Sequence, residues 1–415
     1  MSYPSNIYQQ VALYNESDLV LFQNSNVFLN KSNKMFQNFQ NFSGQKGSTV
    51  TFRKPTKYTV TDSLVIQFQA TVDELLTLTV DQEASVGFAN TVQNYVYNAK
   101  DYMDAYGRSA VVQLGAKVET NLARNCETAP YRFYGNGTTQ ISTPNDLANA
   151  VALFKNVGYA PSNIEGVLSD VAIPNIANAG LAQFAPDRNN KLANTWELAP
   201  FAGCSWYSSN LLPTHLSGTE GTASSTLTVV STVTNSEGGV TSITFSGTNG
   251  ASDANSIKLH DRFQFFDGVT GFTNLRFLTQ TGYIPSSAPV QFRSTVNAAS
   301  TGASQVTVDI FPALQATAGI HQNINTPIVP GMQVFVLPSH RAGVIWSNSP
   351  LYLGMPQLPD QFPYPTGNKV DEKTGASIRH TYGSIVFQNQ IGTSYDCLWG
   401  SVMDPDRTMA VIFPL

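Results

Sequence analysis

Apolar residues recur at intervals of three and four from Val92 to Leu122, and this is the clearest pattern along the chain. The intervening members are Tyr95, Val96, Ala99, Tyr102, Met103, Tyr106, Ala110, Leu114 and Val118. The spacing predicts one amphipathic helix of about 30 residues, about 45–50 Å long at 1.5 Å per residue. Such a length exceeds that of most helices in globular domains and indicates a spine, with possible bends at Gly107 and Gly115.

Residues 48–69 follow a different period, that of alternating apolar and polar positions, which predicts a β-hairpin. The apolar members are Val50, Phe52, Tyr58 and Val60 in the first strand and Leu64, Ile66 and Phe68 in the second. Two strands alone are marginal in water, so we expect the hairpin to pack on a neighbouring subunit. Arg53, Lys54 and Lys57 around Pro55 are the candidate intersubunit contacts; solvated edge residues are the alternative.

The first 45 residues are polar, rich in Asn and Gln, and contain a short amphipathic stretch between Leu19 and Phe39. Two interpretations stay open for this segment. It is either a helix packed on its own domain or an arm that reaches a neighbouring subunit.

Helical and strand patterns alternate over residues 128–216, which indicates α+β structure. Thr143 and Pro144 are suited to the N-cap and first turn of a helix that continues to Phe154. A strand at 164–168 and a short helix at 171–181 are expected next.

A sudden change in composition marks the segment that follows. Of the 34 residues from Ser217 to Gly250, 16 are Ser or Thr, and short alternating runs separated by turns continue to Leu337. Short strands at this spacing predict a small β-barrel or sandwich. Strands are expected again at 342–346, 377–390, 397–401 and 409–413, so residues 218–337 are predicted to be a domain inserted into another.

Charge is scarce, at 12% Asp, Glu, Lys and Arg, about half the ~25% of an average soluble protein. A surface with so few charges is typical of a chain whose surface is largely covered by neighbours. The net charge of −5 and the absence of a basic stripe argue against dedicated nucleic-acid binding. Cys126, Cys204 and Cys397 are widely spaced, which indicates free thiols and not a disulfide framework.

Motifs that carry chemistry are missing from the sequence. It has no phosphate-binding loop, nucleophile elbow, His-Glu-x-x-His or dinucleotide fingerprint, and its five histidines stand singly. Asp404-Pro405-Asp406 is interpreted as a turn. We therefore expect no catalytic residues, no metal site and no cofactor, and neither a signal peptide nor a membrane span.

The order of arm, hairpin, long helix, α+β domain, β insertion and closing strands resembles the coat proteins of tailed bacteriophages, which have the Hong Kong 97 fold. The insertion narrows the resemblance to the short-tailed Salmonella-phage coat sub-family. Similar stretches are Ile257–Phe263, in which His260-Asp261 stands where Gly-Asp is usual, Phe201–Asn210, Val306–Ala313, Ala342–Trp346, Ser377–Arg379 and Cys397–Val402.

This resemblance implies a domain organisation and a set of partners. The expected parts are an N-terminal arm (1–45), an extended hairpin or E-loop (46–74), a peripheral domain with the spine helix (75–127), the first part of an axial domain (128–217), an inserted β-barrel (218–337) and axial and peripheral return strands (338–415). Subunits of the family form pentamers and hexamers with a scaffolding protein and a portal ring. They are assembled in the host bacterial cytoplasm, and the virion shell encloses double-stranded DNA without sequence-specific binding.

Two other classes of protein are weighed against this interpretation. A tail spike, fibre or adhesin would explain the Ser- and Thr-rich strands, but not the long helix, and it should show repeats. An enzyme with an inserted β domain would need convergent ionisable groups, which the sequence does not display.

Overall fold

The computed structural model describes residues 26–33, 47–58, 60, 64, 68, 73–91, 106–158, 162–176, 200–223, 225–250, 252–266, 275–280, 282–360, 364, 366–370, 376–385 and 390–415. The chain is strand-rich and forms two compact units. Unit 1 comprises Met1–Lys54, Leu75–Asn125 and Leu351–Met403, and unit 2 comprises Pro55–Glu74, Cys126–Pro350 and Asp404–Leu415. This division does not test the six parts expected above, which stay predictions. None of the helices in the described ranges is long and apolar enough to cross a membrane.

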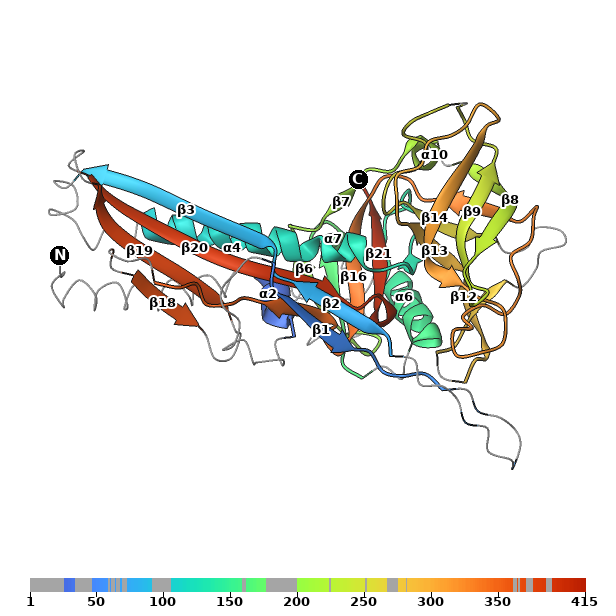
Figure 1. The fold of residues 1–415 in the computed structure, drawn as a ribbon, viewed down its shortest axis with the longest axis horizontal. Coiled ribbons are helices and arrows are strands. Elements are labelled where there is room, and N and C mark those ends of the chain that lie inside the picture. Colours follow the sequence, from blue (N-terminus) through green and yellow to red (C-terminus); the bar gives the residue numbers. More distant parts are fainter. Residues whose placement is uncertain are drawn as a thin grey trace. The chain divides into compact units, whose positions relative to one another are not determined.

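Unit 1 is built on a long antiparallel sheet. Its central strand, β20 (Gln390–Met403), pairs with β19 (Ser377–Ile385), β3 (Gln82–Thr91) and β17 (Leu351–Gly354), and β18 (Thr366–Val370) extends the sheet beyond β19. Figure 1 shows β3, β20 and β19 running side by side over most of their length, with α4 alongside. β19 and β20 lie where strands were expected at 377–390 and 397–401, with β19 shorter and β20 longer than predicted.

Helix α4 (Arg108–Ala123) confirms the second half of the predicted spine helix. Ala110, Leu114, Val118 and Leu122 are buried as their spacing requires, and Lys117 on the other face is exposed. Gly115 lies within the helix without ending it. The first half of the prediction, residues 92–105, lies outside the described residues.

Glu119 is a buried exception on the apolar face of α4. Its two carboxylate oxygens accept hydrogen bonds from the backbone N–H groups of Phe28 (2.7 Å) and Leu29 (3.1 Å). These residues belong to α2 (Val27–Lys31), where Phe28 and Leu29 are fully buried. The first turn of a helix has unpaired N–H groups, so a carboxylate from α4 can cap it. For residues 26–33, packing on the chain's own unit is the interpretation that the structure supports.

The extended hairpin differs from its prediction in the position of its second strand. Strand β1 (Thr49–Arg53) pairs with β2 (Leu75–Thr79), whereas the expected second strand was at residues 64–68. Of that stretch only Leu64 and Phe68 are described, and neither lies in a strand. The base of the hairpin also packs inside unit 1, because Phe52 stacks on Tyr352 with ring centroids 4.8 Å apart. The expectation that the hairpin lacks an intrachain core was therefore wrong at its base.

Unit 2 contains a second sheet with the strand order β4 (Phe133–Tyr134), β21 (Thr408–Pro414), β16 (His340–Ser347), β5 (Ile164–Ser169) and β6 (Cys204–Ser209). Strands β21 and β16 are buried along nearly their whole length, which explains their apolar runs. Helix α6 (Pro144–Val157) covers one face with its apolar side. Its N-terminus is the predicted one: Thr143 and Asp146 form a reciprocal capping box.

Six strands of the inserted segment form a closed antiparallel barrel in unit 2. They are β10 (Arg262–Phe265), β13 (Gln291–Ser294), β14 (Gln305–Leu314), β9 (Val240–Ser246), β8 (Thr226–Thr234) and β15 (Gln333–Val336), in that order around the ring. Of the small barrel and the sandwich that the short strands predicted, the structure shows the barrel. β11 (Arg276–Leu278) instead pairs with β12 (Pro285–Pro289) outside the ring, and Phe277 of β11 also forms an antiparallel bridge with Ile324.

Candidate functional site: the barrel–sheet joint

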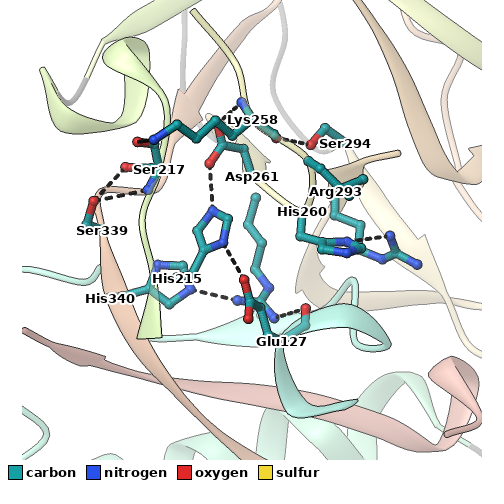
Figure 2. Close-up of polar contacts among 12 residues, drawn as sticks. Glu127, His215, Ser217, Lys258, His260, Asp261, Arg293, Ser294, Ser339 and His340 are labelled. Atoms are coloured by element: carbon teal, nitrogen blue, oxygen red, sulfur yellow. Dashed lines mark hydrogen bonds and ion pairs between the residues drawn. The ribbon is translucent and has the colours of Figure 1, made fainter. Parts of the chain in front are cut away.

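A cluster of five ionisable side chains lies where the inserted segment leaves and re-enters the sheet of unit 2. We call Glu127, His215, Asp261, Arg262 and His340 the joint (Figure 2). Asp261 and Arg262 come from the start of β10 in the barrel. The other three come from the host part: α5 (Asn125–Thr128), β7 (Thr214–His215) and the first residue of β16.

The backbone brings the two histidines together. β7 pairs with β16 in a register that places His215 opposite His340, with ring centroids 5.2 Å apart. His215 is close to the point where the chain enters the insertion, and His340 is close to the point where it returns. Facing positions in a sheet are neighbours even when they are far apart in sequence, so the two ends of the insertion meet at this pair.

His215 lies between two carboxylates. Its Nε2 is 2.7 Å from Asp261 Oδ1, and its Nδ1 is 2.8 Å from Glu127 Oε1. A neutral imidazole has a single N–H and could donate to only one of them. With both carboxyl groups ionised, both contacts are hydrogen bonds only if His215 is an imidazolium, so the geometry favours the charged form.

His340 requires the opposite state. Its Nδ1 is 2.7 Å from the carbonyl oxygen of Pro338, to which it must donate, and its Nε2 is 2.6 Å from Arg262 Nη1. Arg262 has only donors, so Nε2 has to accept and carries no proton. The other end of the fully buried guanidinium donates to the carbonyl oxygens of Cys126 (3.2 Å) and Glu127 (2.9 Å).

The pKa directions agree with this geometry. Burial works against the charged form of His215, but the hydrogen bonds with Asp261 and Glu127 outweigh it and raise its pKa. For Glu127 burial raises the pKa, yet the hydrogen bond and charge of His215 prevail and lower it. Burial, followed by the positive charge of Arg262, holds the pKa of His340 well below its ordinary value.

Asp261 also organises the turn that leads into β10. Its Oδ2 accepts from the backbone N–H groups of Lys258 (2.7 Å) and Gly218 (3.1 Å). His260 in this turn has a φ of 70°, in the left-handed region that glycine adopts most easily. His260 contacts Arg293 (3.1 Å), and burial with the charge of Arg293 lowers its pKa to about 4.

A second, neutral contact holds the barrel to the sheet. The Gln291 side chain of β13 accepts from the backbone N–H of Phe133 (2.8 Å) and donates to the Phe133 carbonyl (2.9 Å). Tyr131, just before β4, packs edge-on against Phe277 and Phe311 of the inserted segment. The barrel's apolar core therefore includes residues from outside the insertion.

The joint is arranged to hold two parts of the chain together. His215, Asp261, Arg262 and His340 are each at most 3% exposed, so a dissolved substrate does not reach them. Within the described ranges, no three or more His, Cys, Asp and Glu side chains are grouped to hold a metal ion. The three cysteines are buried free thiols, as expected.

The contact candidates chosen from the sequence lie elsewhere. Arg53 is exposed at the end of β1, and Lys54 after it is half-buried. Lys57 Nζ is 3.9 Å from Glu74 Oε1 of the same chain. Nothing in the structure of one chain tests their role between subunits.

Sequence reasoning missed the joint because its histidines stand singly along the chain. The side chains that hydrogen-bond to one another across the joint are 46 to 88 positions apart, and the fold brings them together. Asp261 and Arg262 lie in the stretch Ile257–Phe263, which the resemblance singled out without giving these two residues a role.

Solved structures with overall similarity to this chain include those of phage capsids and heads. One from Mycobacterium phage Che8 is 10% identical, with 93% of this chain and 90% of that chain covered and a TM-score of 0.46. The capsid structure of cyanophage P-SCSP1u is 10% identical, with 92% and 88% covered and a TM-score of 0.41. The head structure of Helicobacter pylori bacteriophage KHP40 is 8% identical, with 90% and 85% covered and a TM-score of 0.41.

No protein-family model matches the chain, and no curated protein matches it in sequence.

Proposed function

We propose that this chain is the major capsid protein of a tailed bacteriophage and self-assembles into an icosahedral shell. The observation that carries the proposal is the order of its parts. The paired base of a long loop (β1 and β2) is followed by a helix beside a long sheet (α4 with β3 and β20), and then by an α/β sheet interrupted by a closed barrel. This is the order that the resemblance to the Hong Kong 97 fold implies.

In this assignment, β1 and β2 are the base of the E-loop and α4 is the spine of the peripheral domain. The sheet centred on β16 and β21 belongs to the axial domain. Residues 218–337 form the inserted barrel, as in the short-tailed Salmonella-phage coat sub-family.

Exposed apolar residues also support a role in assembly. Val60, Leu64 and Phe68, between β1 and β2, are more than 90% exposed. In the assembled shell we expect such side chains to be covered by neighbouring subunits. Charged residues make up only 12% of the chain, so few charges would have to be desolvated or brought close to like charges when neighbouring subunits make contact.

The partners follow from the same proposal. The chain would form pentamers and hexamers with copies of itself, co-assemble with a scaffolding protein around a portal ring in the bacterial cytoplasm, and enclose double-stranded DNA in the virion. The net charge of −5 fits enclosure without tight binding of DNA.

Electron microscopy of the purified chain, expressed with and without its scaffolding protein, tests the proposal. We expect closed shells that sediment far faster than the 45.0 kDa subunit. Fibres would favour a tail spike or fibre, and small uniform particles under both conditions would contradict the capsid assignment.

The hairpin contacts are tested by a charge-reversal variant, Arg53→Glu with Lys54→Glu and Lys57→Glu. We expect folded subunits that fail to form shells, because rim charges mainly affect association. Adding Glu74→Lys restores the intrachain pair of Lys57 and controls for its loss. Lys117→Glu on the exposed face of α4 controls for a single added negative charge; normal shells from the triple variant would rule out these residues as contacts.

A further inference from the structure

The two facing histidines of the joint are held in opposite charge states by their partners. His215 donates from both ring nitrogens to carboxylates, and His340 accepts a hydrogen bond at Nε2 from Arg262. Figure 2 shows the His215 ring between the barrel residue Asp261 and the host residue Glu127, with the His340 ring beside it. His340 cannot gain a proton at Nε2 without losing its contact with Arg262, which crosses from the barrel to the sheet, and His215 cannot lose a proton without losing its contact with Asp261 or with Glu127.

The charges of the joint balance when His215 is charged and His340 is neutral. Asp261 and Glu127 supply two negative charges, and His215 and Arg262 supply two positive charges, all with little access to solvent. A buried network of this kind is stable when every member is paired and costly when one is not. One additional proton on His340 would add a third positive charge beside Arg262 and His215.

We propose that the joint is a pH-operated fastening between the inserted barrel and the sheet, closed while His215 is charged and His340 neutral, and opened by a proton on His340.

On acidification, the added proton sits at Nε2 of His340 and points at Arg262 Nη1, 2.6 Å away. The ring loses its role as acceptor, and two like charges face each other without solvent between them. Arg262 then has to turn away from His340, so the tie between β10 and the start of β16 is lost. The neutral contact of Gln291 with Phe133 keeps the barrel attached while this charged side loosens.

The pH range follows from the folded-state pKa directions. His340 has a pKa well below 6.5 in the closed joint, so opening is favoured as pH falls below the ordinary histidine value. His215 acts in the other direction: its raised pKa favours the closed form at low pH, and closure weakens as pH rises through that pKa. His260 also resists protonation, but its partner Arg293 belongs to the inserted segment, so that contact does not cross the joint.

This inference does not rest on shell formation, because the fastening acts within one chain and can be measured on unassembled subunits. The first test is nitrogen NMR of the wild-type protein labelled at its five histidines. At pH 7 we expect His215 to show two protonated ring nitrogens and His340 to show a neutral ring with its proton on Nδ1. A neutral His215 or a charged His340 at pH 7 would overturn the proposal, whatever the behaviour of any variant.

The second test follows hydrogen exchange in full-length subunits at pH 7 and pH 5. The amide of Ala342, which donates to Pro213 across the β7–β16 pairing (3.0 Å), reports on the joint, and the amides of β9 and β14 report on the barrel. After correction for intrinsic rates, we expect protection at Ala342 to fall about five- to tenfold on acidification. A histidine that titrates near 6.5 in the open form drives this loss, and His215 offsets part of it. Protection within the barrel should stay constant.

Two variants isolate the responsible ring. His340→Gln keeps an acceptor for Arg262 and a donor for Pro338 but has no titrating group, so its acid-induced loss of protection should disappear. His260→Asn is the matched control, since asparagine tolerates the left-handed backbone at that position, and it should lose protection as the wild type does. The proposal fails if His340→Gln loosens like the wild type, or if barrel and joint lose protection together.

Discussion

The barrel interior and the joint are both buried in unit 2, yet opposite kinds of interaction hold them. In the barrel, Phe263 and Phe292 stack with centroids 4.9 Å apart at an angle of 2°, and Phe245 lies parallel to Phe263 at 5.8 Å. In the joint, His215 and Arg262 contact carboxylates, carbonyl groups and a second histidine.

The contrast shows that the interactions that keep a region folded can differ from those that fix its orientation on its neighbour. Apolar burial contributes free energy in proportion to the area removed from water and depends little on direction. A charged network contributes little net stability, because desolvation offsets attraction, but it tolerates only one geometry. We therefore expect the aromatic core to keep the barrel folded and the joint to set its orientation on the sheet.

The largest effect is expected from Phe292→Ala. The side chain is fully buried and stacks on Phe263, so its removal leaves a cavity and should lower the free energy of unfolding by about 3–5 kcal/mol. Urea unfolding followed by circular dichroism measures the loss. Phe292→Leu, which fills part of the space, is the control and should cost less; equal stability of Phe292→Ala and wild type would show that the stack is not a core.

Arg262→Ala is expected to cost about 3 kcal/mol, because removing one member of a buried charge network leaves the others unpaired. The loss should appear in the same urea experiment. Arg262→Lys keeps the charge but not the planar fork that reaches His340 and two carbonyl groups, so it should fall between alanine and wild type. If lysine restored full stability, charge alone and not geometry would hold the joint.

Gln291→Ala removes the neutral contact and should lower the free energy of unfolding by about 1–3 kcal/mol, because the buried N–H and C=O of Phe133 lose their partner. In the same variant, the rate of hydrogen exchange at the Phe133 amide should increase. Gln264→Ala, which removes only the bond from Gln291 to Gln264, is the control and should have a smaller effect. Unchanged exchange at Phe133 would argue against this contact.

The smallest effect, about 1 kcal/mol, is expected from Thr143→Ala at the N-cap of α6. This cap lies outside both regions and gives a reference for a single local interaction. Ser142→Ala leaves the cap intact and should be nearly neutral in thermal unfolding. A loss at Thr143 as large as that at Arg262 would mean that the joint contributes no more than an ordinary cap.

Local features of the sequence determined most of the elements. The spacing of Ala110, Leu114, Val118 and Leu122 predicted the buried face of α4, and Thr143 predicted the start of α6, because both depend on residues within one or two turns. The Ser- and Thr-rich segment predicted the closed set of short strands for a similar reason. An alternation of apolar and polar residues can be recognised from neighbouring positions alone.

Tertiary structure decided which of these elements meet. Residues 64–68 and 75–79 both suit a strand, and the described pairing of β1 is with β2, which also packs on β20. The joint depends on contacts over 46 to 136 positions, and nothing local distinguishes His215 from the other single histidines. The charge states of His215 and His340 depend on how many donors and acceptors surround each ring. That number exists only after distant strands have paired, so it is a property of the fold and not of any segment.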